Sequence, residues 1–151
     1  MNSIRIPDVP FRRIAAHGEQ TYPEECCGVM LGKEIGNERI VQETIEIDNS
    51  QDENRRRRFL ISPEQYRKAE RQAAERNMEL LGFYHSHPDH PAAPSAFDTE
   101  HALPWFSYVI ISVTKGKLDR ATSWVLEDDR VRFAEQLLAV PARAEHAPTI
   151  K

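Results

Sequence analysis

Three polar side chains in the middle of the chain have the types and the spacing of a metal site. His85 and His87 are one residue apart and directly follow the apolar stretch 80–84. On a strand, where side chains alternate between two faces, both imidazoles would project from the same face. Asp98, further along the chain, offers a third ligand. Two imidazoles and one carboxylate, with a fourth position left to water, are typical of a catalytic rather than a structural zinc site.

Ser95 and Asp98 also allow a structural interpretation. The spacing Ser95-x-x-Asp98 is that of a capping box that would open a helix at Ala96. For Ser95 the two interpretations are compatible, because its oxygen can cap the helix while its proton remains available. For Asp98 we expect a conflict, since one carboxylate oxygen would have to serve both the cap and the zinc.

The run His85-Ser86-His87, seven further residues and then Ser95-x-x-Asp98 resembles the signature of the JAMM (MPN-plus) zinc metalloprotease family. That family also has a catalytic glutamate far upstream. The segment 22–32 resembles the one that carries it, and the pattern Pro-x-Glu-x-Cys-Gly selects Glu25 rather than Glu24.

The resemblance extends from about Asp8 to about Val140 and implies a fold. Members of the family are α/β proteins, three-layer αβα sandwiches around a mixed β-sheet, similar to cytidine deaminases. The resemblance also implies one Zn²⁺ per chain, with the metal ligands His85, His87 and Asp98. It assigns catalytic roles to Glu25, as the acid/base, and to Ser95, as a donor to the oxyanion. Since every position is filled, we expect an enzyme rather than a scaffold.

The resemblance further implies a class of substrate. Small stand-alone prokaryotic members of the family commonly process ubiquitin-like sulfur-carrier proteins, and this chain is similar to the subgroup that releases cysteine. We therefore expect a metallopeptidase that hydrolyses a peptide or isopeptide bond at the C-terminus of such a carrier. One alternative is a deconjugating, deubiquitinase-like isopeptidase. The other is a non-catalytic, zinc-containing protein-binding module.

The composition is that of a single compact domain, which we place at 1–140, followed by a mobile tail at 141–151. The net charge of −4 gives no case for nucleic-acid binding, and no apolar stretch approaches the ~20 residues of a membrane span. The adjacent Cys26 and Cys27 do not indicate a disulfide framework and suit a cytoplasmic protein. The run Arg55 to Arg58 is either a solvated loop or a contact surface for an acidic partner.

Local signals predict alternating helices and strands that would form a mixed sheet with helices on its faces. A first helix should begin at the cap Asp8 and end before Pro23. A second should begin at the cap Ser62, with Pro63 at its first position and Gln65 completing a capping box, and should run to about Asn77. A short third helix should span 95–103. Strands are expected at 27–32, 39–47, 59–61, 79–87, 107–114, 120–126 and 131–140.

A few other side chains near these motifs have two interpretations each. His90 is either a substrate contact or a solvent-exposed loop residue, and His101 either hydrogen-bonds a metal ligand or packs in a partly buried position. Trp105 is expected in the core. Tyr84 should point away from both imidazoles, and Ala74 should face inward from the second helix.

Overall fold

The structure is a computed structural model that describes residues 2–47 and 61–141. Three helices are present in these ranges: α1 (Asp8–Thr21), α2 (Pro63–Glu75) and α3 (Ala96–His101). The strands are β1 (Ser3–Arg5), β2 (Cys27–Ile35), β3 (Glu38–Ile47), β4 (Glu79–Pro88), β5 (Ser107–Thr114), β6 (Lys117–Leu126), β7 (Phe133–Gln136) and β8 (Leu138–Ala139).

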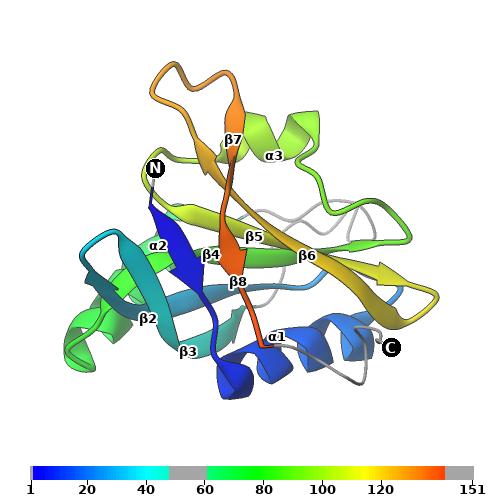
Figure 1. The fold of residues 1–151 in the computed structure, drawn as a ribbon, viewed down its shortest axis with the longest axis horizontal. Coiled ribbons are helices and arrows are strands. Elements are labelled where there is room, and N and C mark those ends of the chain that lie inside the picture. The colour runs from blue at the N-terminus through cyan, green and yellow to red at the C-terminus, as the bar shows by residue number, and fades with distance from the viewer. Residues whose placement is uncertain (1, 48–60, 142–151) are drawn as a thin grey trace.

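The strands form one mixed sheet in the order β7-β6-β5-β4-β2-β3-β1-β8. The β4–β5, β1–β3 and β1–β8 pairs are parallel and the other pairs are antiparallel. β7 and β8 stand at opposite ends of this order although only Leu137 separates them in sequence. The segment 133–139 therefore bridges the two margins of a curled sheet, and Figure 1 shows it running from β7 down to β8 beside β1.

Helices cover both faces of the sheet, which confirms the three-layer αβα architecture (Figure 1). On one face α1 contributes Phe11 and Ile14 to a buried cluster that includes Tyr84 of β4. On the other face α2 contributes Ala69 and Ala73 to a second cluster that includes Phe83. Because Phe83 and Tyr84 are adjacent on one strand, the two clusters are separated only by the thickness of the sheet.

A β-bulge in β4 determines on which face of the sheet, that of α1 or that of α2, each side chain after Leu81 lies. Met30 of β2 pairs with Gly82, whereas Leu31 pairs with Leu80, so Leu81 is an extra residue on β4. Leu80 and Phe83 consequently lie in the α2 cluster, while Leu81 and Tyr84 lie in the α1 cluster. From Phe83 onward, odd-numbered residues face α2, and these include both histidines.

The predicted caps agree with the structure at α2 and α3 but not at α1. Ser62 and Gln65 form the expected reciprocal capping box, with Pro63 at the first helical position. At α1 the N-cap is Pro7 and makes no side-chain cap bond, so the expectation of Asp8 as the cap was wrong. Asp8 instead lies in the first turn, where its charge suits the helix dipole, and it pairs with Arg12 at 2.8 Å.

Three further expectations need correction. The predicted strand 131–140 is interrupted at Leu137, where the chain passes from one margin of the sheet to the other. Ala74 is exposed, because α2 buries only the narrow stripe formed by Ala69 and Ala73. Trp105 is 44% exposed and does not belong to the core; its ring covers the guanidinium of Arg39 at 3.9 Å.

Some expectations fall outside the described residues: the loop and arginine run at 49–58, most of the short strand at 59–61, and the tail from 142 onward. Over residues 2–47 and 61–141, no helix has the length and apolar character needed to span a membrane.

Two glycine substitutions test how closely β4 and β5 approach each other. A Cβ on Gly82 would lie 1.9 Å from the carbonyl oxygen of Ser107, and neither backbone can move without breaking the strand pairing. We expect Gly82→Ala to lower the free energy of unfolding by about 3 kcal/mol or more. The control is Gly18→Ala in α1, where the Cβ would meet the flexible end of Ile111 and the helix gains from alanine. Its cost should stay below about 1 kcal/mol in urea titrations; equal costs would contradict this interpretation.

Candidate metal centre

The central strand β4 positions the two histidines. It pairs with β2 as far as Cys27–His85 and with β5 as far as Pro88–Val113, so β5 fixes its backbone through both histidines. His85 is 1% exposed and His87 is 7% exposed. Two imidazoles are thereby held on the α2 face of the sheet, at the end of a strand that cannot shift its register.

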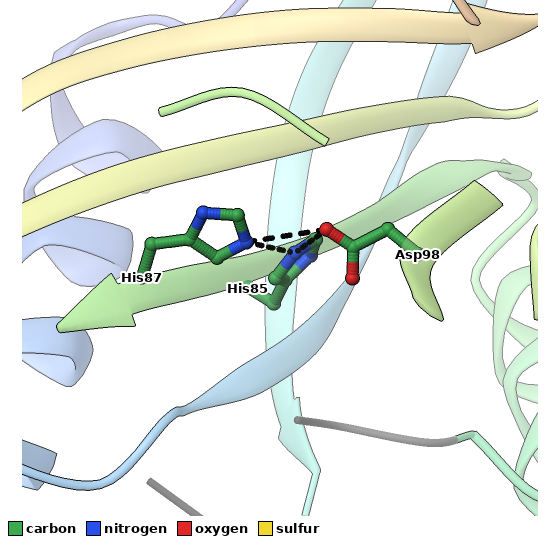
Figure 2. A group of neighbouring side chains, drawn as sticks. All are labelled: His85, His87 and Asp98. Carbon is green, nitrogen blue, oxygen red and sulfur yellow. Dashed lines mark hydrogen bonds and ion pairs between the residues drawn. The ribbon is translucent and has the colours of Figure 1, made fainter. Parts of the chain in front are cut away.

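The capping box of α3 positions the carboxylate. Asp98 N–H donates to Ser95 Oγ at 3.0 Å, and Ser95 N–H donates to Asp98 Oδ2 at 2.9 Å. This reciprocal pair fixes the side chain of Asp98 at the start of the helix and directs it toward the histidines (Figure 2). The side chain of Asp98 is 7% exposed, so the group is buried although the helix itself is near the surface.

The three side chains converge through one atom each. His85 Nε2 lies 3.1 Å from His87 Nε2, and Asp98 Oδ2 lies 3.2 Å from both nitrogens (Figure 2). Ligand bonds of about 2.0–2.1 Å in a tetrahedral zinc site put neighbouring ligand atoms about 3.3 Å apart. The observed triangle therefore fits one face of such a site, with a fourth position left over.

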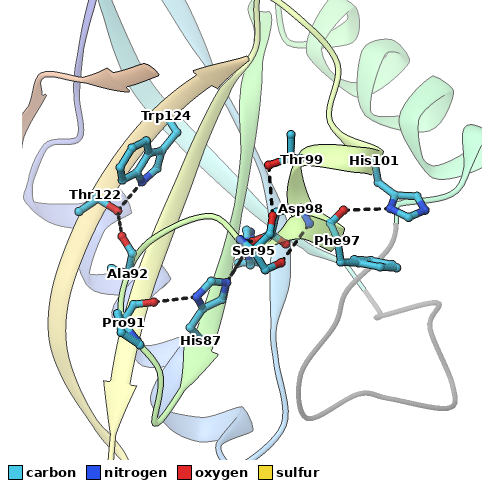
Figure 3. Close-up of polar contacts among 11 residues, drawn as sticks. His87, Pro91, Ala92, Ser95, Phe97, Asp98, Thr99, His101, Thr122 and Trp124 are labelled. Carbon is cyan, nitrogen blue, oxygen red and sulfur yellow. Dashed lines mark hydrogen bonds and ion pairs between the residues drawn. The ribbon is translucent and has the colours of Figure 1, made fainter. Parts of the chain in front are cut away.

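The protonation of His87 supports a metal between these atoms. Its Nδ1 lies 2.8 Å from the carbonyl oxygen of Pro91, which can only accept (Figure 3). Nδ1 therefore carries the proton, and in the neutral ring Nε2 presents a lone pair to His85 and Asp98. A backbone carbonyl on the far nitrogen is the usual way in which proteins orient a metal-binding histidine.

The electrostatics favour the charge states that metal ligands need. Burial lowers the pKa of His85 and so favours the neutral imidazole. Burial alone would raise the pKa of Asp98, but the adjacent His85 and His87 rings and the Ser95 N–H, which donates to Oδ2, hold that pKa far below its usual range. Neutral imidazoles beside an ionised carboxylate are the states that bind divalent metals.

The conflict that we expected at Asp98 does not arise. Oδ2 both accepts the Ser95 N–H and faces the two imidazoles, so a single oxygen serves the cap and the triad. Each carboxylate oxygen has two lone pairs, and one can be used for each partner. The capping box is thus a part of the centre rather than an alternative to it.

The loop that joins the two halves of the triad is itself anchored. Thr122 Oγ1 donates to the carbonyl oxygen of Ala92 at 2.6 Å and accepts from the indole of Trp124 at 2.8 Å (Figure 3). The next carbonyl toward the N-terminus, that of Pro91, is the one that holds His87. β6 therefore fixes the loop, and through the loop it fixes the orientation of a histidine.

Comparison with known proteins identifies the family. The model of Prok-JAB, the prokaryotic homologs of the JAB domain, matches residues 8–127. The chain belongs to the JAMM/MPN family. It is 31% identical over 106 residues to the Desampylase of Pyrococcus furiosus, a match that covers 69% of this chain and 68% of that protein. It is also 31% identical to the tail tip assembly protein K of Escherichia phage N15, over 70% of this chain but only 39% of the phage protein.

Solved structures agree with this assignment. A protein from Desulfitobacterium hafniense is similar with a TM-score of 0.79 and 28% identity, covering 95% of this chain and 96% of that one. A protein from Salinibacter ruber gives 0.69 and 38%, covering 93% and 92%. A JAB1/MPN domain protein from Archaeoglobus fulgidus gives 0.56 over 92% and 100% of the chains, and at 14% identity it shows the fold alone. The family, the desampylase relative and the buried triad together support a JAMM-type hydrolase.

Two cavities have members of the JAMM triad in their walls. The first, of about 300 Å³, is lined by Glu25, His87, His90, Pro91, Ala93 and Ser95. Glu25 is 4% exposed, whereas Glu24 is exposed to solvent. Ser95 accepts the cap bond through its oxygen and retains its proton for another partner. The structure therefore brings Glu25 and Ser95 to one cavity beside a triad histidine.

The second cavity, of about 350 Å³, is mostly apolar and has His85 and Asp98 in its wall. Its other lining residues are Ile61, Ser62, Pro63, Tyr66, Arg67, Phe83, Phe97, His101, Ala102, Leu103, Tyr108, Ile110 and Phe133. They come from α2, α3, β4, β5, β7 and residues flanking the two helices, which meet only in the folded chain. Because these elements are distant in sequence, no local signal predicts this cavity.

The remaining histidines near the site differ from one another. His90 is exposed and lines the cavity that contains Glu25. His101 is also exposed, and its Nδ1 lies 3.0 Å from the carbonyl oxygen of Phe97, so neither a bond to a ligand nor a buried packing role is observed (Figure 3). Sequence reasoning also missed Pro91, whose carbonyl holds His87; a stiff proline-rich loop between the ligands was the available clue.

Removal of one triad imidazole tests the metal centre. The purified protein should carry about one equivalent of zinc, and His87→Ala should weaken zinc binding by more than about 100-fold, because two ligands make a poor site. The matched control is His101→Ala, which removes an exposed imidazole from α3 outside the triad. Metal analysis and competition with a chromogenic chelator measure both variants. Full zinc occupancy of His87→Ala would refute the site.

Proposed function

We propose that this protein is a zinc-dependent metallopeptidase that hydrolyses a peptide or isopeptide bond at the C-terminus of a ubiquitin-like or sulfur-carrier protein. The observation that carries the proposal is the convergence of His85, His87 and Asp98 beside a cavity that Glu25 lines. A buried set of three ligands with an open fourth position is the composition of a catalytic zinc site.

The residues of this chain divide the chemistry among themselves. Zinc, when bound by the triad, would lower the pKa of a water toward ~7 and so supply a nucleophile at neutral pH. Glu25 would accept a proton from the attacking water and return it to the leaving amine. The hydroxyl proton of Ser95, which the cap bond does not use, is available to the developing oxyanion.

The two cavities differ in which part of the substrate they suit, the leaving group or the acyl portion. Since Glu25 must protonate the leaving amine, the leaving group should occupy the cavity of about 300 Å³ that Glu25 lines. The acyl portion then lies toward the apolar cavity on the side of His85 and Asp98. A Gly-Gly end suits the position between them, because glycine lets the main chain approach the metal closely.

The kind of substrate is supported by similarity. One relative is a desampylase, which favours a ubiquitin-like protein as the substrate, in agreement with the resemblance of the motifs. Release of cysteine from a sulfur carrier and deconjugation of an isopeptide use the same chemistry and differ only in the leaving group. A binding module that holds zinc without catalysis is the alternative from another class, and turnover distinguishes it.

Substitution of two neighbouring glutamates distinguishes an effect on zinc binding from an effect on kcat. Glu25→Gln preserves the shape of the side chain but removes the base, so zinc should remain bound while kcat falls by ~10²–10⁴. Glu24→Gln is the matched control, since Glu24 is exposed and adjacent in sequence. Its kcat should change less than about twofold, as is usual for a surface substitution. The reverse pattern would place the catalytic glutamate one residue earlier, and equal activity of both variants would contradict the proposed mechanism.

The second test concerns recognition of the carrier. We expect cleavage of a folded ubiquitin-like carrier that bears residues beyond its Gly-Gly end, and little cleavage of a free peptide with the same terminal sequence. The reason is that a short tail alone buries too little surface for tight binding, whereas a folded body adds an interface. Mass spectrometry of the products gives both rates and shows whether a single residue or a longer segment leaves. Equal rates for carrier and peptide would indicate a general peptidase.

A further inference from the structure

The segment that carries Glu25 is tied at both ends to the strand that carries the imidazoles. Tyr22 precedes the segment and Cys26 follows Glu25. Each of them makes a hydrogen bond to a residue close in sequence to the triad histidines: Cys26 to Ser86, which lies between them, and Tyr22 to Asp89, two residues after His87. Residues 23–25 therefore bridge two fixed points on one strand and its exit.

At Ser86, a side-chain hydrogen bond takes the place of a backbone hydrogen bond between β2 and β4. β2 and β4 pair as far as Cys27 and His85, and one rung further Ser86 N–H donates to the carbonyl oxygen of Cys26 at 3.1 Å. The return bond is made by a side chain: Cys26 N–H donates to Ser86 Oγ at 2.9 Å. Ser86 is fully buried and Cys26 is 2% exposed, so no water can substitute for this hydroxyl.

The partner of Tyr22, Asp89, is itself fixed by hydrogen bonds. Tyr22 Oη donates to Asp89 Oδ2 at 2.6 Å, while Lys115 N–H donates to Asp89 Oδ1 at 2.9 Å. Asp89 N–H also donates to the carbonyl oxygen of Val113 at 2.8 Å. The hydroxyl of Tyr22 is thus anchored to the exit of β4 and, through it, to β5.

We propose that Ser86 and Tyr22 are positioning residues that act together as a clamp on Glu25, setting its carboxylate relative to His85 and His87. This inference rests on the proposed function, because it assigns Glu25 the role of acid/base. Neither hydroxyl needs to touch substrate. Proton transfer depends steeply on geometry, and a displacement of about 1 Å at a catalytic group can cost about 100-fold in rate.

The test removes each hydroxyl while keeping the rest of the side chain. Ser86→Ala should lower kcat about 30- to 100-fold and Tyr22→Phe about tenfold, both with KM and zinc content unchanged. In a Glu25→Gln background the same substitutions should have almost no further effect on kcat, because the group that they position is absent. The amide of Cys26 should exchange with solvent faster in Ser86→Ala, which hydrogen exchange measures without any substrate.

Ser123→Ala is the matched control, since Ser123 is an equally buried serine on β6, separated from β4 by β5, and its hydroxyl donates to Gln136 at 2.8 Å rather than to the segment of Glu25. It should lower the melting temperature like Ser86→Ala but leave kcat unchanged. Loss of kcat that persists in the Glu25→Gln background, or an equal loss in Ser123→Ala, would overturn the clamp. If Glu25→Gln itself retains full activity, the proposed function fails instead, so the two failures are distinguishable.

Discussion

Three atoms with lone pairs, two imidazole nitrogens and a carboxylate oxygen, are held 3.1–3.2 Å apart in a buried position. Atoms of this kind repel one another unless a proton or a cation lies between them, and burial removes the water that would otherwise screen them. The fold therefore has to supply the constraints that bring these three atoms together in a geometry that a cation can share. It does so by pairing β4 on both sides, by capping α3 through the same carboxylate, and by fixing His87 through the carbonyl of Pro91.

The far end of the sheet carries a separate polar cluster with a structural role. Arg39 is 2% exposed, donates to Ser107 Oγ at 2.7 Å and lies 3.6 Å from Glu34. Ser107 in turn donates to Gln136, whose amide reaches Asn2 beside β1. These bonds connect β3, β5 and the bridge 133–139, so they close the curled sheet. Because β4 belongs to that sheet, closure also limits how far it can move.

Much of the candidate site could be predicted because its signals are local. The spacing of His85 and His87, and the capping box of Asp98, follow from strand and helix periodicity over a few residues. The elements that were missed depend on distant partners instead. β1 and β8 are only three and two residues long and exist because they pair with each other and with β3. The apolar cavity likewise needs α2, α3 and β7 together, which no short window of sequence contains.

The rule that side chains alternate along a strand correctly places His85 and His87 on one face. Which face they share is decided by the bulge at Leu81, which that rule does not include. Strict alternation from Leu80 would have put His85 and His87 on the same face, but on the side of α1, away from Asp98. One extra residue reverses the alternation and turns both imidazoles toward α3, while Tyr84 and Ser86 turn toward α1. After the bulge, the odd-numbered residues face the cavities and the even-numbered ones face the supporting layer. The period of two in a single strand thus separates side chains suited to chemistry from those that hold the backbone in place.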